Sequence, residues 1–176
     1  ARMQNAGIHV IMMTGDILDT ARAIGIDTGI IQSDDDLILT ARELDAMSDA
    51  QIKKKLYKIK VIARAVPKTK LRLVNIAQEM NLCIGMCGDG TNDAPALKRA
   101  DVGFAMGSGT DVCKEAGDII ITDDNFVSIS DAVLFGRTFL NNVTKFLAFQ
   151  MPINIILIVL SVFFPLKFLV PAFVAV

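Results

Sequence analysis

Residues 85–107 read GMCGDGTNDAPALKRADVGFAMG, and this stretch decides the fold. Two short apolar runs, 82–86 and 102–106, each lead into glycine and polar residues, and a short helical pattern over 94–100 lies between them. A strand, a helix and a second strand in this order are typical of parallel strands joined by a crossover. Ligands of such sheets bind beyond the carboxyl ends of the strands. The polar residues that follow the apolar runs are therefore the candidates for a site.

The same alternation extends in both directions from this stretch. Runs that are apolar on both faces suit parallel strands covered by helices. The other expected strands are Ile8–Met13, Val61–Ala63 and Ile119–Ile121. The expected helices are Ile17–Ile26, Leu44–Ile59 and Lys68–Met80, the last with Pro67 in its first turn. We therefore predict an α/β domain with a doubly wound parallel sheet.

The composition excludes several classes of protein. Of the 176 residues, 52% are hydrophobic and 21% are charged, which excludes a disordered chain. The formal net charge of −1 argues against a nucleic-acid partner, which usually requires a basic surface. The three cysteines form no CxxC pair, so neither a disulfide scaffold nor a zinc site is expected, and a reducing compartment is the simplest interpretation.

Three expected strands are followed by residues suited to a phosphoryl group. The first leads into Thr14-Gly15-Asp16, the second into a segment with Lys70, and the third into GDGTND with Asp89 and Asp93. A hydroxyl and backbone N–H groups can hold phosphoryl oxygens, and a lysine can neutralise their charge. Paired carboxylates can hold magnesium. Taken alone, TGD could be a turn with a helix cap and Lys70 a solvated residue, whereas GDGTND is specific by itself.

A second kind of segment occupies the end of the chain. Phe146–Leu166 contains no charged residue and as a helix would be about 30 Å long, the thickness of a bilayer core. A buried soluble helix is the alternative, but it would normally show a polar face. Arg137 and Lys145 precede this segment and Lys167 follows it, so the positive-inside rule places the N-terminal part in the cytoplasm. Residues 168–176 are apolar again and are expected to begin a second span.

Three stretches of the chain are characteristic in their order: MMTGD, VIARAVPKTK and GMCGDGTNDAPALKRADVGFAMGSGTDVCKEAGDIIITDDNF. Together they resemble the phosphorylation domain of P-type cation-transporting ATPases, which has the haloacid-dehalogenase-like fold. The resemblance covers essentially the whole chain. It implies catalytic roles for Thr14, Lys70 and Asp89, with magnesium as cofactor and ATP as substrate. It also implies phosphate and nucleotide contacts by Thr14, Gly15, Asp16, Arg64, Lys70 and Asn92, and magnesium binding by Asp89 supported by Asp93. Cys87 departs from many relatives, which carry Thr there, and is expected to be a small apolar filler.

The membrane part resembles the stretch that enters the fifth transmembrane helix of the calcium and sodium/potassium pumps. Asn154 matches an Asn that belongs to the ion site of those pumps, whereas Leu157 stands where several relatives carry an acid. This combination is most like the plasma-membrane type of calcium ATPase. The alternative role for Asn154 is a hydrogen bond between helices. The expected divisions are a partial phosphorylation domain over 1–137, a stalk over 138–148, a transmembrane helix over 149–166, and a loop with the start of a further helix over 167–176.

The resemblance implies part of an ATP-driven cation pump, with calcium as the favoured ion. The aspartyl-phosphate of such a pump forms on a DKTGT motif that the chain does not contain. The acidic run Asp34–Asp36 lacks that context and is expected in a surface loop. Because the chain also begins at Ala1 in the middle of a pattern, we expect a fragment that is inactive alone.

The expected partners are the transported cation, the bilayer and the remaining domains of the same pump, with no nucleic acid. The expected location is an integral membrane protein whose α/β domain is cytoplasmic. Two alternatives remain open at this point. One is a phosphatase of the haloacid-dehalogenase type, which should lack the charge-free segment. The other is a truncated, non-catalytic membrane protein that regulates an intact pump.

Overall fold

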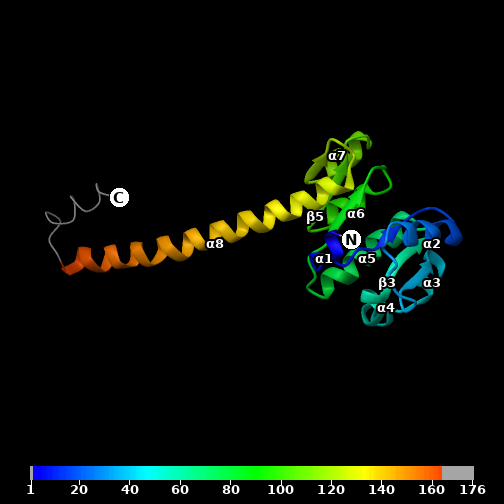
Figure 1. Ribbon diagram of the computed structural model, residues 1–176, viewed down its shortest axis with the longest axis horizontal. Coiled ribbons are helices and arrows are strands. Elements are labelled where there is room, and N and C mark those ends of the chain that lie inside the picture. The colour runs from blue at the N-terminus through cyan, green and yellow to red at the C-terminus, as the bar shows by residue number, and fades with distance from the viewer. Residues whose placement is uncertain (1, 164–176) are drawn as a thin grey trace. The chain divides into compact units, whose positions relative to one another are not determined.

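The computed structural model describes residues 2–163 (Figure 1). Its strands form two sheets of parallel strands. The first sheet has the order β1-β3-β2, with bounds Met12–Met13, Ile59–Ala63 and Leu37–Thr40. The second has the order β4-β5-β6, with bounds Gly85–Gly88, Val102–Met106 and Ile119–Ile121. Every strand pair is parallel, so the carboxyl ends within each sheet share one edge. The predicted parallel α/β fold is confirmed.

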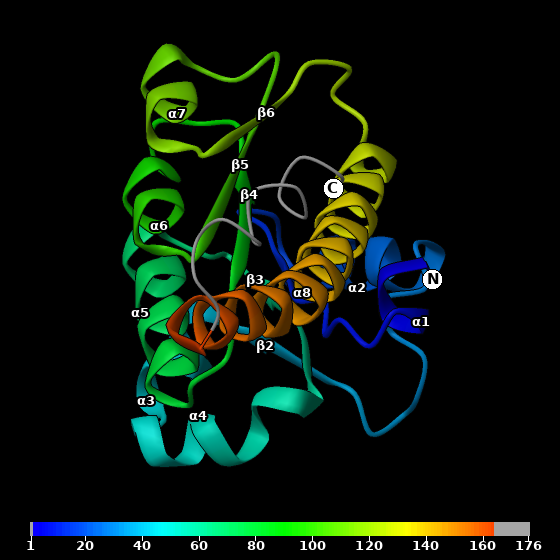
Figure 2. The ribbon, with the colours of Figure 1, turned by 90° about the vertical axis from the view of Figure 1, so that its left-hand side faces the viewer.

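The helices alternate with these strands, as the sequence pattern predicts. Their bounds are α1 Arg2–Asn5, α2 Leu18–Asp27, α3 Ala41–Ala46, α4 Asp49–Lys55, the 3-10 helix η1 Leu56–Lys58, α5 Pro67–Glu79, α6 Ala94–Arg99, α7 Asp111–Ala116 and α8 Phe126–Phe163. In Figure 2, α5, α6 and α7 lie along one side of the strands and α2 lies on the other.

The central strand β3 shows why both faces of the first sheet are apolar. Val61 and Ala63 pack with Ala21 of α2, whereas Ile62 packs with Leu44 and α5 on the opposite face. Successive strand residues point to opposite faces, so this strand needs apolar residues at every position. Burial of large aliphatic side chains contributes about 1.5–3 kcal/mol each, which makes β3 the centre of the core.

The predicted helix Leu44–Ile59 is wrong, because the chain starts two separate helices in this region. Thr40 and Ser48 each form a capping box, with Glu43 and Gln51 as their respective partners. Met47 between the helices is extended, and Ile59 already belongs to β3. A capping box satisfies two otherwise orphaned N–H groups, so two such signals outweigh one continuous helical pattern.

Other elements differ from the prediction in extent. The first strand is limited to Met12–Met13 rather than Ile8–Met13, because only these two residues pair with β3. The strand β2 was not predicted: it is short and directly follows the acidic run. The third expected strand is displaced toward its carboxyl end, since Asp101 fixes the N–H of Ile84 ahead of β4. The short helix α7 was also not predicted.

The chain divides into two units. The compact N-terminal unit ends at Ser130 and the second unit begins at Asp131. The expected boundary at 137 therefore lies inside α8, which continues through both the expected stalk and the expected transmembrane segment. The segment after Phe163, including Lys167 and the expected second span, lies outside the described residues.

Candidate functional site

The loop after β1 is tied to the loop after β3 by backbone hydrogen bonds. Thr14 donates its N–H to Ile62 and accepts from Ala65, and the carbonyl of Asp16 accepts from the N–H of Arg64. The Thr14 hydroxyl donates to a carboxylate oxygen of Asp16 at 2.7 Å. These contacts bring the predicted phosphate-loop residues and Arg64 together, as parallel strand ends should.

Arg64 has a backbone conformation that few side chains adopt. Its φ is +51°, in the left-handed region, and its side chain is exposed. A non-glycine residue in this region costs roughly 1–3 kcal/mol and persists only where surrounding contacts impose it. The bond from its N–H to Asp16 is such a contact. The strained turn therefore directs the chain from β3 toward the first turn of α5.

Lys70 in this first turn forms an ion pair with Asp93. The Lys70 Nζ donates to Asp93 Oδ1 at 2.5 Å, and the two side chains are only 16% and 9% exposed. α5 begins at Pro67, and the N–H of Lys70 donates to the carbonyl of Val66, the residue just before the helix. This bond fixes the backbone of Lys70 close to the loop after β3. The structure thus joins the second and third predicted loops through this pair.

Asp89 differs from Asp93 in its surroundings. Asp89 is exposed, and its carboxylate has no hydrogen bond or ion pair to any of the described residues. Asp93 is buried against Gly88, where an added Cβ would lie 2.5 Å from the Asp93 Cβ. Asp89 therefore offers a free carboxylate, while one oxygen of Asp93 is already occupied by Lys70.

The donor set fits magnesium only in part. Among residues 2–163, no group of three His, Cys, Asp or Glu side chains is placed to hold a metal. Magnesium, however, keeps several waters and often binds through one or two carboxylates plus substrate phosphate. Asp89 suits this mode of coordination as the principal ligand, and Asp93 suits it as a supporting group. Asn92, in the loop of Asp89 and Asp93, and Gly15, in the loop after β1, are also exposed.

The two cysteines near the site are poorly suited to nucleophilic chemistry. Burial, with the neighbouring Asp89 charge as a smaller cause, raises the pKa of the Cys87 thiol to about 11. A thiol with that pKa is protonated near neutral pH and therefore unreactive. Cys113 is fully buried and donates to the carbonyl of Gly88 at 3.3 Å. Both behave as packing residues.

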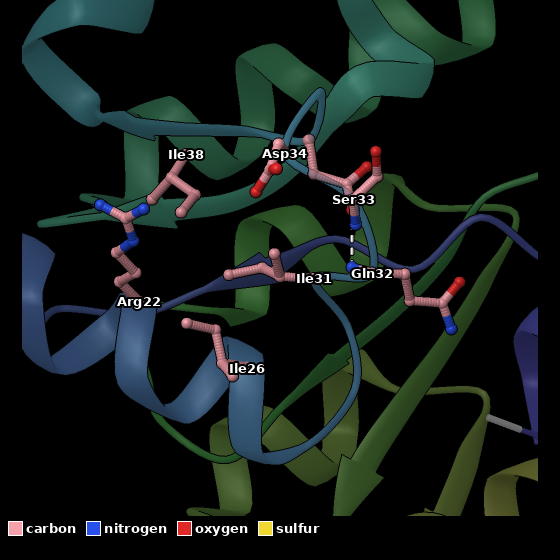
Figure 3. Close-up of a pocket in the computed structure, with 8 residues that line it drawn as sticks. Arg22, Ile26, Ile31, Gln32, Ser33, Asp34 and Ile38 are labelled. Atoms are coloured by element: carbon pink, nitrogen blue, oxygen red, sulfur yellow. Dashed lines mark hydrogen bonds between the residues drawn. The ribbon is translucent and has the colours of Figure 1, made fainter.

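The acidic run Asp34–Asp36 lies in the loop between α2 and β2. It borders a surface hollow of about 430 Å³ that Arg22, Ile31 and other residues also line (Figure 3). Asp36 accepts hydrogen bonds from the N–H groups of Gln32 and Ser33, so it closes this loop. A second hollow of about 560 Å³ is lined by Asn75, Gln78, Glu79 and Arg99. Neither hollow is lined by a predicted site residue.

The helix α8 contains the predicted ion-site residue. Residues Phe126–Ser161 are long and apolar enough to cross a membrane, and the most apolar window is not buried against the chain. Asn154 is exposed and accepts a hydrogen bond from the Gln150 amide at 3.1 Å. Pro152 lies inside the helix and cannot donate to the carbonyl one turn earlier, at Ala148. The side-chain amide of Asn154 and the Ala148 carbonyl, which lacks its usual helical donor, thus lie in the same part of α8.

The residues that contact the backbone of Asp89 were not identified from the sequence. The N–H of Thr110 donates to the Asp89 carbonyl at 2.9 Å, and Gly109 leaves no space for a side chain there. Thr110 is also the N-cap of α7, accepting from the N–H of Cys113. The signal in the sequence is GSGT directly after the fourth expected strand, where a polar loop at a strand end is a candidate for the site.

Comparisons with known proteins identify the fold. Residues 63–133 match the family described as haloacid dehalogenase-like hydrolase. A zinc-transporting PIB-type ATPase solved in an E2.Pi state superposes with a TM-score of 0.69 at 24% identity, over 92% of this chain and 22% of that one. The catalytic domain of the CPx-ATPase CopB-B superposes with a TM-score of 0.55 at 25% identity, over 74% and 41%. The fold is therefore the haloacid-dehalogenase-like one, as predicted.

Curated relatives narrow the family further. The chain is 52% identical over 146 residues to a calcium-transporting ATPase of Listeria monocytogenes, covering 83% of this chain and 16% of that protein. It is 46% identical over 163 residues to calcium-transporting ATPase 1 of Lactococcus lactis, covering 93% and 18%. It is 44% identical over 175 residues to plasma membrane calcium-transporting ATPase 3 of Homo sapiens, covering 91% and 14%.

The chain belongs to the P-type ATPases and corresponds to part of their phosphorylation domain. It spans less than a fifth of the length of these curated relatives.

Proposed function

We propose that the chain is the magnesium- and phosphoryl-binding part of an ATP-driven cation pump, and that calcium is the transported ion. The parent protein would transfer the γ-phosphoryl group of ATP to an aspartate and then hydrolyse the acyl phosphate. The observation that carries this proposal is the joining of three strand-end loops by the Thr14–Ala65 backbone bond and the Lys70–Asp93 ion pair.

Each residue in these loops has a role that its surroundings support. The Thr14 hydroxyl and neighbouring N–H groups would hold phosphoryl oxygens, because such donors stabilise a developing negative charge. Lys70 would turn from Asp93 toward the phosphoryl group when that group arrives. Asp89 would hold magnesium through its free carboxylate, and the metal would supply charge neutralisation between protein and phosphate. Arg64 and Asn92 are exposed at the same edge and are assigned to the nucleotide and phosphate.

The nucleophile is proposed to come from a segment of the parent outside this chain. Within the described residues, β1 pairs only with β3 and β4 pairs only with β5, so each sheet has an edge with unpaired backbone groups. Met13 of β1 packs against the core cluster that contains Met86 of β4, so the two sheets adjoin. An additional strand carrying an aspartate could pair at these edges and deliver its carboxylate to the loops.

The case for calcium rests on the relatives and on α8. The three relatives described above are named as calcium-transporting, and Asn154 supplies an amide oxygen of the kind that calcium accepts. A polar side chain within an apolar span is a functional candidate by default. The same span disfavours a soluble phosphatase of this fold, since such an enzyme has no need of it. We propose a membrane location with the α/β unit cytoplasmic, as the basic residues before the span indicate.

The test is phosphorylation of the parent pump by labelled ATP. We expect an acid-stable, hydroxylamine-labile label that requires calcium, and we expect Lys70→Ala to slow its formation about a hundredfold. Lys68→Ala is the matched control, because Lys68 is exposed and lies on another face of α5. Equal losses in the two variants would show that the lysines form only a basic surface. Absence of the labelled species in the wild-type parent would refute the proposed function.

A further inference from the structure

The loop Gly107–Thr110 packs directly on the backbone of Asp89. The N–H of Thr110 donates to the Asp89 carbonyl at 2.9 Å. A Cβ at Gly109 would lie 2.8 Å from that same carbonyl oxygen and 3.2 Å from the Asp89 Cα. Because the Asp89 carboxylate has no partner of its own among the described residues, these backbone contacts set the direction in which it points.

Asp124 fixes this loop from its other side. Its Oδ1 accepts a hydrogen bond from the N–H of Ser108 at 2.9 Å, while Gly107 donates to the carbonyl of Ile121 at 2.8 Å. Asp124 has a φ of +51°, a left-handed conformation that a short polar side chain tolerates better than most. The residue therefore combines an uncommon backbone conformation with a side-chain bond to a distant loop.

The same turn begins α8. Asp123 Oδ2 accepts from the Ser128 hydroxyl at 2.6 Å, and Asn125 Oδ1 accepts from the N–H of Val127 at 2.9 Å. Asp124 lies between Asp123 and Asn125, yet its own side chain bonds to Ser108 instead of the helix. The first turn of α8 is thus connected through one carboxylate to the loop that supports Asp89.

We propose that Asp124 is a positioning residue that links the start of α8 to the carboxylate assigned to magnesium. This inference deepens the proposed function and rests on it. A displacement of the first turn of α8 moves Asp124, which moves Ser108 and, through Gly109 and Thr110, the backbone of Asp89. Asp124 touches neither the metal nor the phosphoryl group and acts only through this chain of contacts.

The direct test measures amide hydrogen exchange in the 176-residue chain in detergent micelles. Asp124→Gly keeps the left-handed backbone without strain but loses the acceptor, whereas Asp124→Asn keeps an acceptor oxygen. We expect the Thr110 amide to exchange about fivefold faster in Asp124→Gly, the size expected for loss of one hydrogen bond, and to stay near the wild-type rate in Asp124→Asn. Asp123→Ala is the matched control, since Asp123 bonds only near the start of α8.

Three results of this experiment would overturn the inference. The first is an unchanged Thr110 amide in Asp124→Gly, which would mean that the loop supports itself. The second is equal exchange in Asp124→Gly and Asp124→Asn, which would mean that the side-chain bond has no role. The third is loss of protection throughout β5, which would mean that Asp124 maintains the fold instead of positioning one residue.

A second readout uses the parent pump. Asp124→Gly should raise the magnesium concentration for half-maximal phosphoenzyme formation about fivefold while leaving the amount formed at saturating magnesium unchanged. Asp123→Ala and Asp124→Asn should not shift it. A lower maximum without a shift in magnesium dependence would contradict the positioning role. If the wild-type parent formed no phosphoenzyme, the proposed function would fail, whereas the exchange experiment would still report whether Asp124 holds the Asp89 loop.

Discussion

The Lys70–Asp93 ion pair permits a quantitative test of how the strand-end loops are joined. The perturbation is a double-mutant cycle of Lys70→Met, Asp93→Asn and the combined variant in the 176-residue chain. Met preserves much of the apolar length of Lys, and Asn preserves the shape of Asp, so both changes remove charge with little change in volume.

The magnitude follows from the geometry of the pair. Fully exposed ion pairs contribute about 0.2–1 kcal/mol, whereas removal of one partner from a buried pair costs about 3–5 kcal/mol. The side chains here are 16% and 9% exposed, closer to the buried case. We therefore expect each single variant to lose about 2–3 kcal/mol of unfolding free energy. The double variant should lose less than the sum, with a coupling energy of about 2 kcal/mol.

The assay is urea unfolding in detergent micelles followed by tyrosine fluorescence. Tyr57 is the single tyrosine and the chain contains no tryptophan, so the signal reports on η1 in the compact unit. A coupling energy below about 0.5 kcal/mol would refute the reasoning, because it would mean that solvent screens the pair and that Lys70 is not held at Asp93.

Three further predictions concern other parts of the chain. Burial, and secondarily the Lys60 charge, lower the pKa of His9 below 6.5, so the unfolded chain binds the proton more readily than the folded chain does. The urea midpoint should therefore be constant above pH 6.5 and fall as the pH drops toward the folded-state pKa, and His9→Gln should reduce this pH dependence. Gly88→Ala would place a Cβ 2.5 Å from that of Asp93, so it should cost about 1–3 kcal/mol of unfolding free energy by overpacking; an unchanged midpoint would contradict the observed contact. Asn154→Ala in the parent should lower the apparent calcium affinity at least about tenfold while phosphorylation from inorganic phosphate without calcium survives; unchanged calcium dependence with poor expression would assign Asn154 to helix packing.

The sequence predicted most of the strands from their continuous apolar runs and missed the features set by local chemistry. Val102–Met106 and Ile119–Ile121 were placed correctly, because each is a continuous apolar run, and the first of them ends at Gly107. The start of a new helix at Ser48 was not predicted, because the helical pattern of apolar residues continues across it. The capping box of Ser48 and Gln51 is the local signal that ends one helix and begins the next. β2 was not predicted, although its first three residues form an apolar run directly after the acidic residues 34–36.

The predicted site residues lie on connected loops, but their individual partners could not be derived from the sequence. The parallel pairing of β1 with β3 places the Thr14 loop beside the loop that leads to Lys70, as the pattern of parallel strands implies. The pairing of Lys70 with Asp93 depends on side-chain burial, which no spacing encodes. The support of Asp89 by Thr110 joins residues from two different strand ends and required the three-dimensional structure.

The account depends most directly on where magnesium binds to this chain. A magnesium titration of the 176-residue chain in micelles, followed by amide resonances, should perturb residues 88–93 first. Binding should be weak, because the nucleophile that would supply a further ligand is not part of the chain. Asp89→Asn should remove the response, and Asp35→Asn, which changes an exposed carboxylate in the acidic loop, should not. A response that begins at residues 34–36 and survives Asp89→Asn would contradict the assignment of the strand-end loops as the magnesium and phosphoryl site.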